Sequence, residues 1–209
     1  MTPGRVWLAL ALAYLAFFFW YTPFGGPLEP AEIDDFLAQF ASNDFPPEQT
    51  AVWRAFLESD SGGDFAMFNA IEMRAKPLPV DGVSEDASSE EVLAQYTRPF
   101  LGRALRSAAH PVLIGSATSP AVDLWGIEGA ETWSTGGVVR YRSRRDLIEQ
   151  AMAVGPTGIH EFKQAAMQKT IAFPLDPWFQ LGDPRLVLAL VFSNCGLAWH
   201  LRCARRGRA

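Results

Sequence analysis

Cysteine and histidine are scarce in this chain of 209 residues, and their positions exclude several classes of site. The two cysteines, Cys195 and Cys203, lie close to the C-terminus, so residues 29–183 contain neither a disulfide framework nor a Cys-x-x-Cys metal pair. The three histidines are far apart and lack the spacing of metal ligands. We therefore predict no metal site.

Signatures of the common enzyme classes are also absent. The chain has no Gly-x-Ser-x-Gly elbow, no P-loop and no dinucleotide-binding fingerprint. Its acidic pairs fall in expected loops or first helical turns, where capping and solvation explain them, and nothing places two carboxylates across one cleft. The sequence leaves enzymatic activity uncertain and any catalytic residue unknown.

Acidic residues are missing from both ends of the chain. All 23 of them lie between Glu29 and Asp183, together with 12 of the 18 basic residues, which gives this interval a net charge of −11. The flanks hold the other six basic residues and no acidic one, and basic flanks of membrane spans stay in the cytoplasm. An acidic middle without interleaved basic residues also argues against a nucleic-acid partner.

Two uncharged apolar runs match the requirements of membrane spans. Residues 6–24 extend about 28 Å as a helix, close to the thickness of a bilayer core, and Trp20 and Tyr21 suit its interface. A signal peptide is the alternative, with Arg5 in its basic region, but no small-x-small cleavage site follows. We predict an uncleaved transmembrane anchor over residues 1–25.

The second run, residues 186–201, extends about 24 Å as a helix, with Asp183 as its cap and Pro184 in its first turn. A buried helix of a soluble domain is the alternative. The basic tail that follows favours a span over residues 184–202 with a cytoplasmic tail at 203–209. We thus predict a two-span protein of the cell membrane, the inner membrane in a Gram-negative bacterium. Both termini lie in the cytoplasm and residues 29–183 outside it, in the periplasm of such a cell, with the lipid bilayer as partner.

Residues 26–62 are predicted to be a helical linker, with helices from about Pro30 to Phe40 and from Pro46-Pro47 to about Glu58. Residues 63–176 are predicted to fold as an α/β domain. The expected strands are 65–74, 112–117, a third one ending before Ser143, and 170–173. The expected helices are 88–109, kinked or split at Pro99, then 143–154 and 159–169. This order predicts an α+β fold of the ferredoxin-like βαββαβ type. Helices on one sheet face leave the other face open, and a homodimer would cover it.

The stretch from Trp133 to Met152 is predicted to be a strand leading directly into a helix. Gly136 and Gly137 indicate a bulge or a close backbone approach, and Ser143 is placed to cap the helix. Four arginines lie within six residues, at 140, 142, 144 and 145. Two interpretations remain open: a solvated strand end, or an anion site at the helix N-terminus.

Two segments carry a resemblance to a known family. F-A-M-F-N-A-I-E-M-R-A-K-P resembles the first strand of uncharacterised dimeric α/β-barrel proteins, and V-V-R-Y-R-S-R-R-D-L-I-E-Q-A-M resembles their third strand and second helix. The similarity covers roughly Asp64 to Phe173. The membrane segments and the helices at 30–58 depart from the family pattern. The resemblance implies a fold and a homodimer more than an activity.

Some relatives with this fold bind haem or oxidise aromatic substrates. A haem-degrading branch uses an Asn, an aromatic residue and a His, and Asn69, Tyr141 and His160 hold similar places here. The aromatic residue is Tyr rather than Trp, however, and the interval to His160 is longer. We predict that Asn69, Arg140, Tyr141 and His160 line a site for a small ligand or a partner protein, without a cofactor. A haem-handling or monooxygenase-like enzyme is one alternative, and an assembly module with a membrane-protein partner is another.

Overall fold

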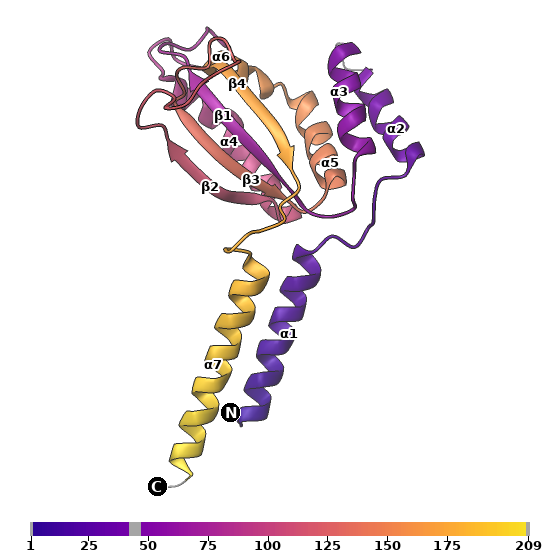
Figure 1. The fold of residues 1–209 in the computed structure, drawn as a ribbon, viewed down its shortest axis with the longest axis vertical. Helices are drawn as coiled ribbons and strands as arrows, with labels where there is room; N and C mark the ends of the chain where they lie inside the picture. The colour runs from indigo at the N-terminus through magenta and orange to yellow at the C-terminus, as the bar shows by residue number, and fades with distance from the viewer. Residues whose placement is uncertain (1, 42–46, 208–209) are drawn as a thin grey trace. The chain divides into compact units, whose positions relative to one another are not determined.

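The computed structural model describes residues 2–41 and 47–207, and it divides the chain into two compact units (Figure 1). One unit comprises Met1–Pro23 with Pro177–Ala209, and the other comprises Phe24–Asp176. Pro46 and Arg208, which the sequence assigned to a helix start and to the basic tail, lie outside the described residues.

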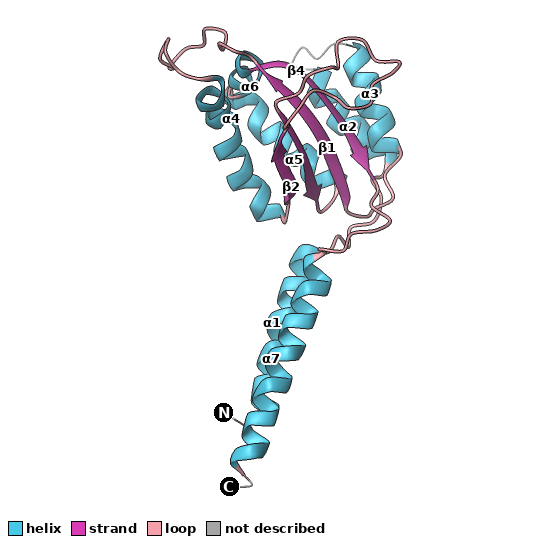
Figure 2. Cartoon of the chain, turned by 60° about the vertical axis from the view of Figure 1, so that its left-hand side comes forward, coloured by secondary structure: helices cyan, strands magenta, loops and turns pink. Residues whose placement is uncertain are grey.

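The larger unit contains one four-stranded sheet. Its strands are β1 (Phe65–Met73), β2 (His110–Ser116), β3 (Thr135–Tyr141) and β4 (Met167–Leu175), in the order β2-β3-β1-β4 with every neighbouring pair antiparallel. Helices α4 (Ser89–Ala104) and α5 (Arg144–Val154) cover one face of this sheet (Figure 2). Short 3₁₀ helices, Leu105–Ser107 and Gly155–Thr157, follow α4 and α5, and α6 (His160–Ala166) precedes β4. The predicted α+β class is confirmed.

The covered face of the sheet is an aromatic and apolar core. Phe65 of β1 stacks on its cross-strand partner Tyr141, with ring centroids 5.3 Å apart, and both side chains are almost completely buried. Ala104 of α4 and Leu147 of α5 close this cluster from the helix side. Because side chains alternate along a strand, every second residue of β1 and β3 points to this covered face.

Helices α2 (Pro30–Ala41) and α3 (Pro47–Glu58) pack against α5 and extend the core. Ile33 and Leu37 of α2 meet Leu57 of α3 and Ile148 of α5 in a second buried cluster, which Leu28 completes. The segment predicted as a helical linker therefore shares a hydrophobic core with the rest of this unit.

The four clustered arginines all bind groups of the protein, and two of them, Arg142 and Arg145, keep about a quarter of the side chain exposed. Arg140 is fully buried and donates to the Asp64 carboxylate and to the Ala108 carbonyl. Arg142 pairs with Asp146 on the first turn of α5, and Arg145 pairs with Glu32 of α2, 2.8 Å from Nε to Oε1. Each pairing carboxylate neutralises its cation, so these contacts give the arginines a structural role.

Arg144, at the start of α5, is buried against the extension of the domain that α2 and α3 form. Its guanidinium donates to the Phe56 carbonyl and to Ser59 Oγ, lies 4.6 Å above the Phe56 ring, and sits 3.6 Å from Asp60 Oδ1. Asp60 in turn accepts from the backbone N–H groups of Leu28 and Gly62. This buried pair joins the start of α5 to the end of α3 and to the entry of α2.

The predicted helix caps are confirmed. The Ser143 hydroxyl accepts from the Asp146 N–H at the start of α5, and Ser88 with Glu91 forms a complete capping box on α4. Pro99 lies inside α4, which continues to Ala104. A Cβ on Gly137 would lie 3.2 Å from the Leu113 carbonyl, so a close approach rather than a bulge accounts for this glycine.

Several expected boundaries were wrong. The helix expected at 88–109 ends at Ala104, where the 3₁₀ helix Leu105–Ser107 follows it. The strand predicted at 170–173 begins at Met167 and runs through Pro174 to Leu175, so Lys169 is a strand residue and not a helical one. β4 is an edge strand, where proline is tolerated because its nitrogen has no ladder partner to serve. The second strand begins two residues early, at His110, and carries the irregular register between Pro111 and Leu113.

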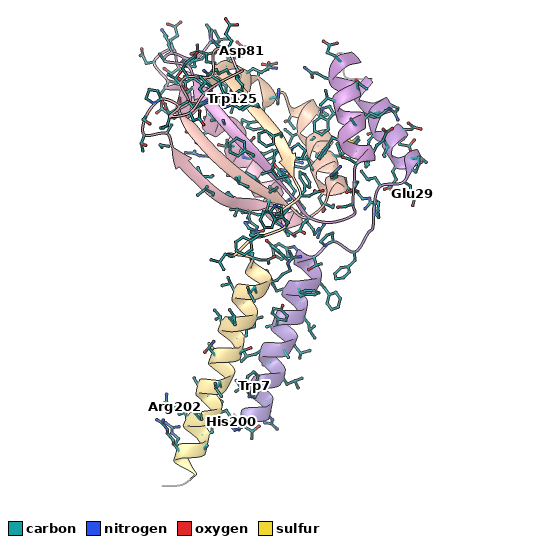
Figure 3. The ribbon with its side chains drawn as sticks, in the orientation of Figure 1. Trp7, Glu29, Asp81, Trp125, His200 and Arg202 are labelled. Atoms are coloured by element: carbon teal, nitrogen blue, oxygen red, sulfur yellow. The ribbon has the colours of Figure 1, made fainter. Side chains whose placement is uncertain are left out.

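The smaller unit consists of α1 (Pro3–Tyr21) and α7 (Pro184–Arg206), packed side by side. Trp7 of α1 fits against Gly196 of α7, where a Cβ would come within 2.6 Å of the indole ring (Figure 3). The Tyr14 hydroxyl donates to the Arg185 carbonyl. Both helices are long and apolar enough to cross a membrane, and α7 is longer than the sequence run suggested.

Replacing Asp60 with Ala should lower the free energy of unfolding by about 3 kcal/mol, because it leaves the buried Arg144 guanidinium without its closest carboxylate. Asp34→Ala is the matched control. It breaks the solvent-exposed pair with Arg54 and should cost less than about 1 kcal/mol. Urea unfolding of the purified variants gives both values. Equal, small losses would show that the buried pair does not hold the extension in place.

Candidate functional site

The sheet face opposite α4 and α5 is apolar, and we call it the open face. Its residues alternate with those of the core and come from all four strands: Phe68, Leu113, Val138, Ile171 and Phe173. Phe68 and Phe173 contact each other with ring centroids 5.1 Å apart. Leu113 is 65 % exposed, Ile171 44 % and Phe173 42 %, so no part of the described chain covers these side chains fully.

The long connection between β2 and β3 adds further exposed apolar side chains. Val122, Trp125 and Ile127 are largely exposed on it, and Trp125 projects from this loop in Figure 3. The loop is ordered by its own backbone bonds, from Ala121 N–H to Glu131 carbonyl and from Ala117 N–H to Ser134 carbonyl.

The loop is also tied to the sheet. Lys169 of β4 donates to the Gly129 carbonyl and lies over the Trp133 ring, 4.8 Å from its centroid. An ordered loop with outward apolar side chains, next to an apolar sheet face, is typical of a surface that contacts another macromolecule.

The four predicted site residues do not share one face of the sheet. Asn69 and Tyr141 point to the covered face, whereas the alternation of β3 places Arg140 on the opposite one. Asn69 Nδ2 donates to the Met67 carbonyl of its own strand. Arg140 is held by Asp64 and Ala108, as described above, so its described contacts are those of a structural residue.

Tyr96 of α4 brings Tyr141 and His160 into one neighbourhood. The His160 ring meets the Tyr96 ring edge-on at 6.0 Å, and Lys163 Nζ lies 5.8 Å from the same ring centroid. Burial raises the pKa of Tyr96 to about 12, and burial, assisted by Tyr96, also raises the pKa of Tyr141. Both phenols are therefore neutral donors at physiological pH.

The pKa values of the two basic side chains of α6 are lowered rather than raised. Burial lowers the pKa of His160, with a smaller contribution from the Lys163 charge, and burial lowers the pKa of Lys163. A neutral imidazole beside the neutral Tyr96 phenol offers hydrogen-bond donors and an acceptor to a polar ligand group. Sequence reasoning missed Tyr96 because its helical spacing with Phe100 marks it as an ordinary core residue.

The Tyr96 neighbourhood does not fit the haem arrangement that the family resemblance implies. Tyr141 is occupied by its stack on Phe65, and the Asn69 amide is engaged with its own strand. His160 packs against Tyr96 and lies one turn before Lys163, so the imidazole is flanked by an aromatic ring and a second base. These side chains are therefore not arranged to hold a haem.

A separate groove of about 660 Å³ runs along the start of α4. Its walls are formed by the loop before α4 and by α4 itself: Gly82, Val83, Ser84, Asp86, Ala87, Glu90, Glu91, Ala94, Gln95 and Arg98. None of the four predicted site residues lines it. Among the residues that the structure describes, no group of three or more His, Cys, Asp or Glu side chains is arranged to hold a metal ion.

The arrangement of the strands and helices is similar to that of two solved structures. One is the crystal structure of RPA0582, a protein of unknown function from Rhodopseudomonas palustris, with 22 % identity and a TM-score of 0.51 over 66 % of this chain and 97 % of that one. The other is methylated RPA0582, with 23 % identity and a TM-score of 0.52 over 67 % and 96 %. No family model matches the chain, and no curated protein does. Identities this low show a shared fold and no activity.

The pKa of His160 should lie below its ordinary value of about 6.5, and Lys163→Met should raise it, because that variant removes the nearby positive charge. The rise should be partial, since burial is the larger cause. Titration of the imidazole Cε1 proton by NMR in residues 29–183 gives both values. That segment holds only His110 and His160, so His110→Gln identifies the His160 resonance. A pKa above 6.5 in the unmodified chain would contradict the contact between His160, Tyr96 and Lys163.

Proposed function

We propose that this protein is a membrane-anchored binding module whose α/β domain dimerises through the open face. The open face carries this proposal. A sheet whose helices cover one side only must bury its other apolar side against something, and a second copy offers an equally apolar, similarly shaped surface. Most of the exposed strand residues there are Leu, Ile or Phe, the types that dominate the cores of stable homodimer interfaces.

The finer fold assignment is part of the same proposal. Strand order β2-β3-β1-β4 with antiparallel pairs, and the chain order β1, α4, β2, β3, α5, β4, support a ferredoxin-like sandwich. Two such sheets packed face to face form the dimeric α/β-barrel of the family that the sequence resembles. Under this proposal the ligand or partner protein contacts the domain near Tyr96 and His160, on the helix-covered side of the sheet and away from the dimer interface.

Membrane anchoring rests on the composition of the smaller unit. Its two helices have apolar surfaces, and the short connection to α7 carries Trp178, Phe179 and Leu181, each more than 70 % exposed. Aromatic residues at the end of an apolar helix are typical of the level of lipid headgroups. Arg185, paired with Asp183 and lying 5.5 Å from the Tyr21 ring centroid, adds a charged group at the same ends of α1 and α7.

The enzyme alternative has less support. A monooxygenase-like reaction needs a ligand cavity lined by the predicted site residues, and Arg140 and Tyr141 are already packed by protein groups. The assembly-module alternative, with a membrane-protein partner, is compatible with the exposed loop at Val122 and Trp125. In this alternative the surface binds a different membrane protein, whereas in the leading proposal it binds a second copy of this chain.

Native mass spectrometry of residues 29–183 should detect a dimer, and Phe173→Glu should convert it to a monomer by placing charges on the open face. Val52→Glu is the control, because Val52 is equally apolar and 70 % exposed but lies on α3. The same spectrum reports any retained small molecule. A ligand-free monomer from the unmodified domain would reject the dimeric binding module.

Reporter fusions test the proposed orientation. An alkaline phosphatase joined after Pro30 should be active, because it would lie outside the cytoplasm, whereas a fluorescent reporter of cytoplasmic folding joined at the C-terminus should be bright. The basic tail and the acidic middle are the physical reason. If both fusions reported the cytoplasmic side, the two-span topology would be wrong.

A further inference from the structure

Helix α7 carries two rows of side chains on opposite faces. The row nearer α1 contains the less exposed residues Ala189, Phe192, Gly196 and Trp199, with Gly196 buried beneath the Trp7 ring. The opposite row, which we call the bare seam, consists of Val187, Leu190, Asn194, Leu197 and Leu201. All five are exposed, the four apolar ones at 44–56 %.

The bare seam has the spacing of a coiled-coil contact. Its residues are separated by three, four, three and four positions, which is the a and d pattern of successive heptads. Such spacing keeps one side-chain row facing a second helix that crosses at a shallow left-handed angle, in soluble coiled coils and in most membrane bundles. α1 occupies the other face of α7, so this seam is not used within the described chain.

Asn194 lies near the middle of α7 and at the centre of the seam. Its Nδ2 donates to the Leu190 carbonyl at 2.8 Å, one turn earlier on its own helix. An amide has two N–H donors and an acceptor oxygen, and the described chain supplies no partner for Oδ1. In the hydrocarbon core of a bilayer no water is present to bind that oxygen, which makes the unpaired amide costly.

We propose that the bare seam of α7 binds the same seam of a second copy of this chain, with Asn194 paired to the partner's Asn194. This inference rests on the proposed membrane anchoring. Each Asn194 Oδ1 accepts an N–H from the amide of the partner subunit, which satisfies both oxygens while the apolar seam residues pack around them.

A second copy fits this seam better than an unrelated helix for a geometrical reason. Two copies enter the membrane with the same orientation, so their α7 helices are parallel and their Asn194 residues lie at the same depth. A two-fold axis along the membrane normal then places each seam residue opposite its own equivalent. An amide is self-complementary in this arrangement, because it both donates and accepts. An asparagine at a central a position specifies register and number of helices in the same way.

Position-specific disulfide crosslinking tests the seam in the full chain in native membranes. The first variant is Leu197→Cys in a background with Cys195→Ser and Cys203→Ser, which leaves one thiol on the seam. The control is Cys203→Ser alone, which leaves the natural Cys195, exposed and at nearly the same depth but off the seam. Mild oxidation should crosslink most of the first variant and little of the control.

Substitution of Asn194 measures the contribution of the amide. Asn194→Leu should weaken association of the full chain in detergent micelles by about 3- to 30-fold, measured by energy transfer between labelled copies, as expected for a polar contact between membrane helices. Asn194→Gln, which keeps an amide, should retain most of the association. Ser193→Leu, one residue off the seam, should leave it unchanged.

Each outcome bears on the proposal. Equal crosslinking of Leu197→Cys and of Cys195, or no crosslinking of either, would overturn it, as would full association of Asn194→Leu. Extraction of the membranes with alkaline carbonate separates the two levels of inference. A chain that stays in the membrane without seam crosslinks contradicts only the α7 dimer, whereas a chain released into the supernatant contradicts the anchoring and the dimer together.

Discussion

The larger unit depends on the charge of Arg144 being neutralised inside the fold. Arg144 begins α5, the helix whose inner face closes the core against β1 and β3 and whose outer face receives α2 and α3. Asp60, Ser59 and the Phe56 carbonyl surround its guanidinium at the end of α3. A cation removed from water is costly unless it is paired, so the extension must dock where these groups meet Arg144. Arg145 and Glu32 add a second, more exposed tie to α2, which lowers the pKa of Glu32 to about 2. That tie is complete above about pH 4.5 and is lost as the pH falls towards 2.

Two surfaces remain without partners after these internal contacts are made. One is the open face of the sheet and the other is the bare seam of α7. In both cases the other face of the same element is packed. Helices cover the opposite face of the sheet, and α1 covers the opposite face of α7. Single exposed apolar residues are ordinary on protein surfaces, but rows of exposed apolar residues are not. These two surfaces are therefore candidates for contacts with other molecules.

Local elements were predictable from the sequence because their determinants are local. Ser143 and Ser88 cap their helices through atoms three residues away, and alternation identified β1 and the two faces of the sheet. The arginine cluster was not predictable, since Glu32 is 113 positions from Arg145 and no spacing rule joins them. The neighbourhood of Tyr96 and His160 could not be predicted for the same reason: α4 and α6 are far apart in the sequence and meet only through tertiary packing. Pro174 misled the prediction because proline ends central strands but not edge strands.

The two proposed contacts constrain each other through symmetry. A contact between identical patches has a two-fold axis. Two different contacts of this kind form one closed dimer only when their axes coincide. If the axes differ, the contacts join copies of the protein into an open chain. In the proposed α7 dimer the axis lies along the membrane normal, because both copies of the helix would cross the bilayer in one direction. The proposed open-face dimer would have to share that axis for the same two copies to pair through both surfaces. Trp178, Phe179 and Leu181 lie on the connection between β4 and α7 and are exposed. If these side chains enter the lipid headgroup layer, they set the depth of this connection in the membrane, and coincidence of the two axes is the condition under which both proposed contacts belong to one dimer.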